Sequence, residues 1–63
     1  MIVHGYKSNA NFLGVKNAIR KHTNYDAKTV SSIVSQIQQG KSVTLPDDFV
    51  LREDLEDANL LIA

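Results

Sequence analysis

The chain has 63 residues and no cysteine, and its seven basic residues balance seven acidic ones. A domain of this size buries only about 60% of the surface that its unfolded chain exposes, which leaves little room for a deep active site, and the lack of cysteine excludes disulfides, thiolate metal sites and thiol nucleophiles. The longest apolar run is about four residues, far short of the roughly 18 that span a bilayer, and the N-terminus lacks a signal-peptide pattern, so we expect one cytoplasmic domain, residues 1–63, with no membrane partner.

The first part of the chain predicts a strand and two helices. Residues 1–6 are β-branched and aromatic and are followed by turn-forming residues, which predicts a strand. Asn11 is a suitable N-cap, and apolar residues then recur at helical spacing, so residues 12–22 predict a helix. A second helix over residues 27–39 has an apolar stripe about 100° wide. Gly40 is the left-handed residue expected after that helix.

The second part predicts a strand, a short helix and a closing strand. Residues 41–45 alternate between polar and apolar, as in a strand with one buried face. Asp47 or Asp48 caps a short third helix that ends near Asn59. Residues 60–63 are apolar and predict the last strand. The order βααβαβ predicts a small two-layer α+β domain with a three-stranded sheet, one face of which is covered by the two middle helices.

The neutral net charge conceals two oppositely charged segments. Residues 1–41 hold six Lys or Arg and one Asp, a net charge of +5, whereas residues 42–63 hold one Arg and six Asp or Glu, a net charge of −5. Such asymmetry points to an acidic protein or a nucleic acid as partner of the basic segment. Attraction between the two segments, within one fold or between copies, would explain the same pattern.

Catalytic and metal-binding patterns are not found in the sequence. The only histidines, His4 and His22, are eighteen residues apart, and no serine stands in a nucleophile elbow. The six carboxylates between residues 47 and 57 lack the spacing of a calcium loop and are typical of a solvated helix face. We therefore expect no enzymatic activity and no cofactor, and either histidine to be structural or incidental.

A helix-turn-helix is an alternative interpretation of the first two helices. Residues 23–26 have the length of the turn in that motif. The second helix would present side chains that can contact bases or phosphates, namely Lys28, Thr29, Ser31, Ser32, Ser35 and Gln36. It carries a single cation, whereas phosphate contacts usually involve several.

Two families have a similar pattern across most of residues 2–63. The stretch from Ile19-Arg20 to the closing strand resembles the C-terminal domain of the bacterial ribosomal stalk protein, through Thr23, Lys28, Ile33-Val34 and the segment Leu55-Glu56-Asp57-Ala58-Asn59. The region from Asn24-Tyr25-Asp26 to Gln39-Gly40-Lys41-Ser42-Val43 is similar to the ClpS adaptor of the Clp protease. Both families have a βααβαβ fold, which the resemblance implies here.

The resemblance also implies a type of function. The stalk domain recruits translation GTPases through paired basic helices, and Arg20 and Lys28 match basic positions of that surface. We therefore predict a small bacterial or phage regulator, an adaptor-like module that docks a basic helical face on an acidic surface of a larger protein. The residues predicted to bind the partner are Lys16, Arg20, Lys21 and Lys28. If the apolar closing strand lies at a sheet edge, it could also pair with a copy of itself in a homodimer.

Overall fold

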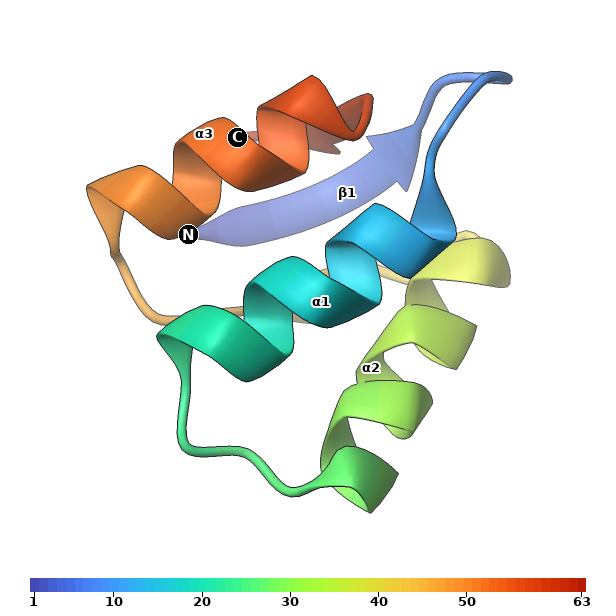
Figure 1. Ribbon diagram of the computed structural model, residues 1–63. Coiled ribbons are helices and arrows are strands. Elements are labelled where there is room, and N and C mark those ends of the chain that lie inside the picture. Colours follow the sequence, from blue (N-terminus) through green and yellow to red (C-terminus); the bar gives the residue numbers. More distant parts are fainter.

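The computed structural model covers residues 1–63 and contains three helices and a three-stranded sheet (Figure 1). Its elements are, in chain order, β1 (Ile2–Tyr6), α1 (Phe12–His22), α2 (Ala27–Gln38), β2 (Val43–Thr44), α3 (Phe49–Asp57) and β3 (Leu60–Ile62). The predicted order βααβαβ is confirmed, and so is the three-stranded sheet, whose strands pair antiparallel. The second strand is shorter than the predicted residues 41–45, because only residues 43 and 44 pair with β1.

Each helix begins at a capping side chain. Asn11, Asp26 and Asp48 each accept a hydrogen bond from the backbone N–H three residues further on, at 2.7–3.0 Å. Such a bond satisfies one of the N–H groups that a helix start leaves without a partner. Asp48, and not Asp47, is therefore the cap of α3.

Two residues in the left-handed conformation end α2 and α3. Gly40 has a φ of 82° just after α2, and Asn59 has a φ of 69° between α3 and β3. Glycine adopts this conformation without steric cost, and asparagine tolerates it better than most residues. Both positions match the stops expected from the sequence.

The sheet has the order β2-β1-β3, so β3 lies at an edge. Along β1, Val3 pairs with Ile62 and Gly5 with Leu61, which leaves His4 as the extra residue of a bulge. The bulge reverses the alternation of side chains along the strand. Tyr6 consequently lies on the side of the helices.

Tyr6 makes two contacts there. Its ring packs edge-on against Phe12, with the ring centroids 4.9 Å apart, and its hydroxyl donates a hydrogen bond to the Gln38 carbonyl at 3.1 Å. These contacts connect the end of β1 to the start of α1 and to the end of α2.

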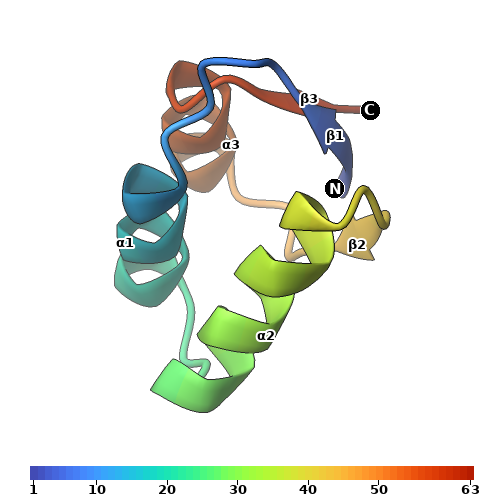
Figure 2. The same ribbon diagram turned by 90° about the vertical axis from the view of Figure 1, so that its right-hand side faces the viewer.

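The helices form two tiers on one face of the sheet. α2 packs on β1 and β2, and α3 packs on β3, whereas α1 packs mainly on α2 and α3 and contacts the strands at its first residue, where Phe12 meets Tyr6 (Figure 2). Three strands about 4.8 Å apart leave room for about two helices whose axes are 8–10 Å apart. The third helix must therefore lie on the other two, which differs from the expectation that α1 and α2 cover the sheet.

The core is entirely apolar. Twelve side chains are buried, none of them polar or charged. They are Val3, Val15, Ala18, Ile19, Val30, Ile37, Val43, Leu45, Leu51, Leu55, Ala58 and Leu60. Every element contributes to this cluster, so the polar side chains of the chain remain at the surface, where the functional features must lie.

Candidate functional site

The most exposed side of α1 is the first candidate. Val15, Ala18 and Ile19 bury the opposite side of the helix. At 100° per residue, the outer side consists of residues within an arc of about 140°. These are Leu13, Lys16, Asn17, Arg20 and Lys21, which we call the α1 outer face.

Leu13 is the unexpected member of this face. Its side chain is 67% exposed, although α1 buries three other apolar side chains. It lies near the middle of the arc, one turn before Lys16 and Asn17 and two turns before Arg20. The face is thus an exposed leucine surrounded by polar and positively charged groups.

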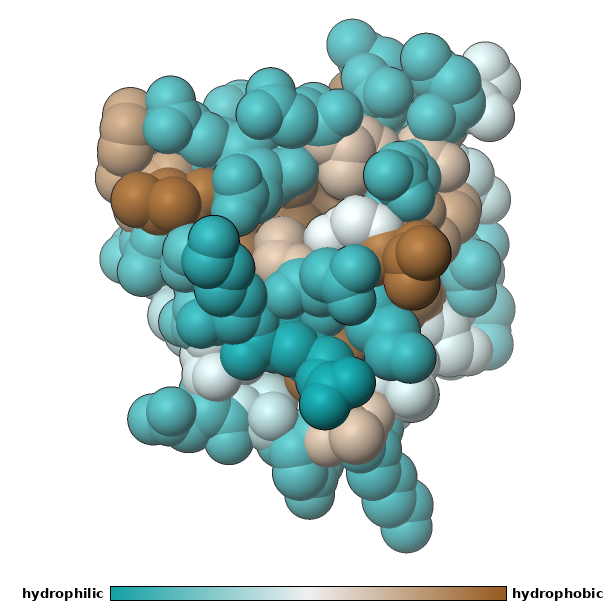
Figure 3. Space-filling view, in the orientation of Figure 1, coloured by the Kyte–Doolittle hydropathy of each residue, from teal (hydrophilic) through white to brown (hydrophobic).

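A groove separates α1 from α3. It has a volume of about 300 Å³, and small residues, Gly14, Ala18 and Ala58, contribute to its lining. Lys21 lines it from α1, and Asp54 and Asp57 line it from α3. In Figure 3, pale atoms lie between hydrophilic side chains along the line where the two helices meet.

Two contacts fix α1 against α3. The Asn11 N–H donates a hydrogen bond to the Ala58 carbonyl at 3.0 Å, and the His22 Nε2 lies 2.9 Å from an Asp54 carboxylate oxygen. The His22 side chain is only 14% exposed. The start of α1 is thus held near the end of α3, and its last residue near the middle of α3, so the two helices are antiparallel. His22 has a structural position, as expected, and His4 is exposed in the β1 bulge.

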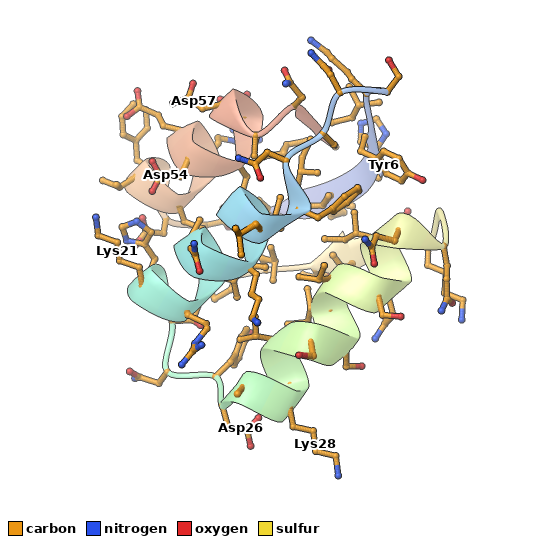
Figure 4. All side chains as sticks on the ribbon, turned by 45° about the vertical axis from the view of Figure 1, so that its right-hand side comes forward. Tyr6, Lys21, Asp26, Lys28, Asp54 and Asp57 are labelled. Atoms are coloured by element: carbon orange, nitrogen blue, oxygen red, sulfur yellow. The ribbon has the colours of Figure 1, made fainter.

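The structure brings together three of the four cations that were predicted to bind a partner. Lys16, Arg20 and Lys21 all belong to the α1 outer face, with Lys16 half-buried and the other two exposed. Lys21 points toward α3 and lies on the side of Asp54, whereas Lys28 projects from the first turn of α2, well away from Lys21 (Figure 4). Lys28 is therefore not part of the same patch.

The positive charge of this face is not compensated by ion pairs within the chain. The two ion pairs of the molecule join the N-terminal ammonium to Asp47 and His22 to Asp54. None of the four predicted cations takes part in either pair. Their charge is consequently available to a partner.

The acidic side chains gather mainly on α3. Glu53, Glu56 and Asp57 are exposed there, and Asp54 is partly exposed. No three His, Asp or Glu side chains are close enough to hold a metal ion. The cluster is thus a negatively charged surface next to the α1 outer face.

Two other carboxylates have a pKa below the usual value for aspartate. Hydrogen bonds from the side chain and backbone of Thr29 lower the pKa of Asp26. A hydrogen bond from the N-terminal ammonium at 2.5 Å, together with its charge, lowers the pKa of Asp47. Both carboxylates are exposed and support local structure, at the start of α2 and ahead of α3.

The sequence prediction missed the exposed apolar residues. The sequence already contains a signal for Leu13, because a count at 100° per residue places it opposite the apolar stripe of α1. Phe49 and Val50, at the start of α3, are 73% and 50% exposed. They are exposed because α3 turns Leu51 and Leu55 to the core. Residues 49–51 are all apolar, so the sequence alone does not show which of them is buried.

No family model matches the chain, and no curated protein sequence or solved structure matches it. The resemblance to the ribosomal stalk domain and to ClpS therefore stays a prediction. None of the three helices is both long enough and apolar enough to cross a lipid bilayer.

Proposed function

We propose that the chain is a small, non-enzymatic docking module that binds an acidic segment of a larger protein through the α1 outer face. The observation that carries this proposal is the 67% exposure of Leu13 among Lys16, Arg20 and Lys21. Protein interfaces commonly have an apolar anchor at their centre and a polar or charged rim. The α1 outer face has this composition within one helix.

The two kinds of side chain would contribute differently to binding. Fully burying a leucine stabilises a complex by roughly 1.5–3 kcal/mol, so Leu13 would supply affinity. Exposed cations at the rim mainly accelerate association with a negatively charged partner and select against positively charged ones. The matching partner surface has an apolar pocket or side chain flanked by Asp or Glu.

The predicted resemblance agrees with a function of this class. The stalk domain docks translation GTPases on basic helices, and Arg20 occupies one of the matching positions. A bacterial or phage regulator that binds a larger protein assembly would use the same chemistry. In that case α2, α3 and the sheet would form the support on which α1 is exposed.

A capture experiment with matched variants tests the proposal. The tagged chain is incubated with bacterial lysate, with and without nuclease, and bound proteins are identified by mass spectrometry. Leu13→Gln and Arg20→Glu should each lose the captured protein, whereas Lys41→Glu, the same charge change at an exposed loop residue outside α1, should retain it. Thermal unfolding of Arg20→Glu and Lys41→Glu should remain within about 0.5 kcal/mol of wild type, as is usual for surface substitutions.

Two results would contradict the proposal. Equal loss of binding with Lys41→Glu would show that overall charge, and not the α1 outer face, governs capture. Loss of the captured proteins on nuclease treatment, with binding that falls linearly with the logarithm of salt concentration, would favour the helix-turn-helix alternative.

A further inference from the structure

A surface of opposite charge lies next to the α1 outer face. α3 lies beside α1 and antiparallel to it, and its outward residues Glu53, Glu56 and Asp57 are exposed. Its first turn exposes Phe49 and Val50. One side of the molecule thus has a basic helix with an exposed leucine next to an acidic helix with two exposed apolar residues.

We propose that this side binds the same side of a second copy of the chain, so that α1 of each copy lies on α3 of the other. A two-fold axis that runs between the two helices, parallel to them and in the plane of contact, exchanges α1 with α3 of the partner. Such an interface is isologous, because both copies contribute the same surface. It places the basic α1 of each copy on the acidic α3 of the other. An axis in the same plane but perpendicular to the helices would instead place α1 on α1 and α3 on α3, and so bring like charges together.

The shape of the two helices fits this arrangement. Figure 2 shows α1 as the helix farthest from the strands, with α3 set back beside it, so a protruding helix meets a recessed one in each half of the dimer. Because the start of α1 lies beside the end of the antiparallel α3, Leu13 would lie over the end of the partner's α3. Phe49 lies about 7.5 Å along α3 before Asp54, the residue that His22 contacts, so it would lie beyond the end of the partner's α1.

The expected association is weak. A standard interface takes about 800 Å² from each partner, about a fifth of this chain's surface of 3931 Å². One side of so small a molecule offers about that area or less. The dimer should therefore form at high protein concentration and low salt, where charge attraction is least screened.

The dimer would also cover the α1 outer face. Leu13 and Arg20 would be occupied, so an acidic partner would compete with self-association for the same residues. This consequence rests on the proposed docking function. The dimer itself does not, and it is tested with the purified chain alone, so failure of one proposal leaves the other standing.

Sedimentation equilibrium on charge-reversed variants tests the dimer. One variant carries Lys16→Glu and Arg20→Glu and so has an acidic α1 next to the acidic α3. The other carries Glu53→Lys and Glu56→Lys and so has a basic α3 next to the basic α1. We expect wild type to dimerise reversibly at about 20 mM salt and to dissociate at about 500 mM, and each variant alone to be monomeric at both.

Mixing the two variants gives the decisive result. The acidic α1 of one then meets the basic α3 of the other at both contacts, so an equimolar mixture should recover the association of wild type. Circular dichroism should show the same helix content in all samples. A wild-type chain that stays monomeric at about millimolar concentration and low salt would overturn the proposal, as would a mixture that does not associate.

A different dimer would also be recognised. If both charge-reversed variants still dimerise and Leu61→Arg does not, the copies pair through the sheet, where Leu61 is exposed on the edge strand β3. That result would refute pairing through α1 and α3 and would favour the closing strand as the contact.

Discussion

Leu55→Ala should remove a large part of the folding free energy. The Leu55 side chain is fully buried in the core. Its truncation loses the transfer free energy of about three carbon groups, roughly 2.4 kcal/mol, and leaves a cavity, so the total loss should be about 2–5 kcal/mol. A chain of 63 residues has a stability of roughly 3–9 kcal/mol. The loss is therefore a large fraction of the total stability, and the variant should unfold at a clearly lower urea concentration than wild type.

Val50→Ala is the matched control, because it shortens an apolar residue of the same helix that is 50% exposed. Its free energy of unfolding should change by no more than about 0.5 kcal/mol. Urea titrations followed by far-ultraviolet circular dichroism measure both variants. A loss below about 1 kcal/mol for Leu55→Ala, or equal losses for the two variants, would refute the assignment of Leu55 to the core and Val50 to the surface.

Three further perturbations test local features of the fold. Gly40→Ala should destabilise the chain by about 1–2 kcal/mol in thermal unfolding, because the φ of 82° strains a residue with a side chain, although no atom lies within 4 Å of the added carbon; an unchanged stability would contradict the left-handed stop. A double-mutant cycle of His22→Ala and Asp54→Ala should give a coupling of about 0.5–1.5 kcal/mol, and additive losses would show that the pair does not hold α1 to α3. Since the pKa of Asp26 is lowered below 3.8 in the folded chain, its ionised form stabilises the fold above that pH and this contribution disappears as the pH falls through the folded pKa. Acid titration should therefore destabilise wild type more than Asp26→Asn below about pH 4, and parallel curves would argue against the cap.

The two functional proposals depend on the same structural cause. A three-stranded sheet accommodates α2 and α3, so α1 is left on the outside with only one side buried. A helix in this outer position usually has polar residues on its free side, but α1 exposes Leu13 there. This departure from a simple amphipathic pattern is the reason for assigning binding to α1 and not to α2.

The sequence by itself determined the local structure. The bounds of α1, the start of α2 at residue 27 and the left-handed Gly40 were all predicted, because caps, helical periodicity and backbone preferences act between residues close together in the chain. The α+β class followed from the order of these elements. The same reasoning identified the basic side of α1, since Lys16 and Arg20 are one turn apart.

Only the tertiary structure decided how these elements combine. It placed α1 mainly on the other two helices, turned Lys21 toward α3 and separated Lys28 from the other cations. It also shifted the pairing of β1 with β3 at His4, which brings Tyr6 to the helix side. These features depend on contacts between residues far apart in the chain, where packing volume and strand register decide the outcome, and no local pattern encodes them.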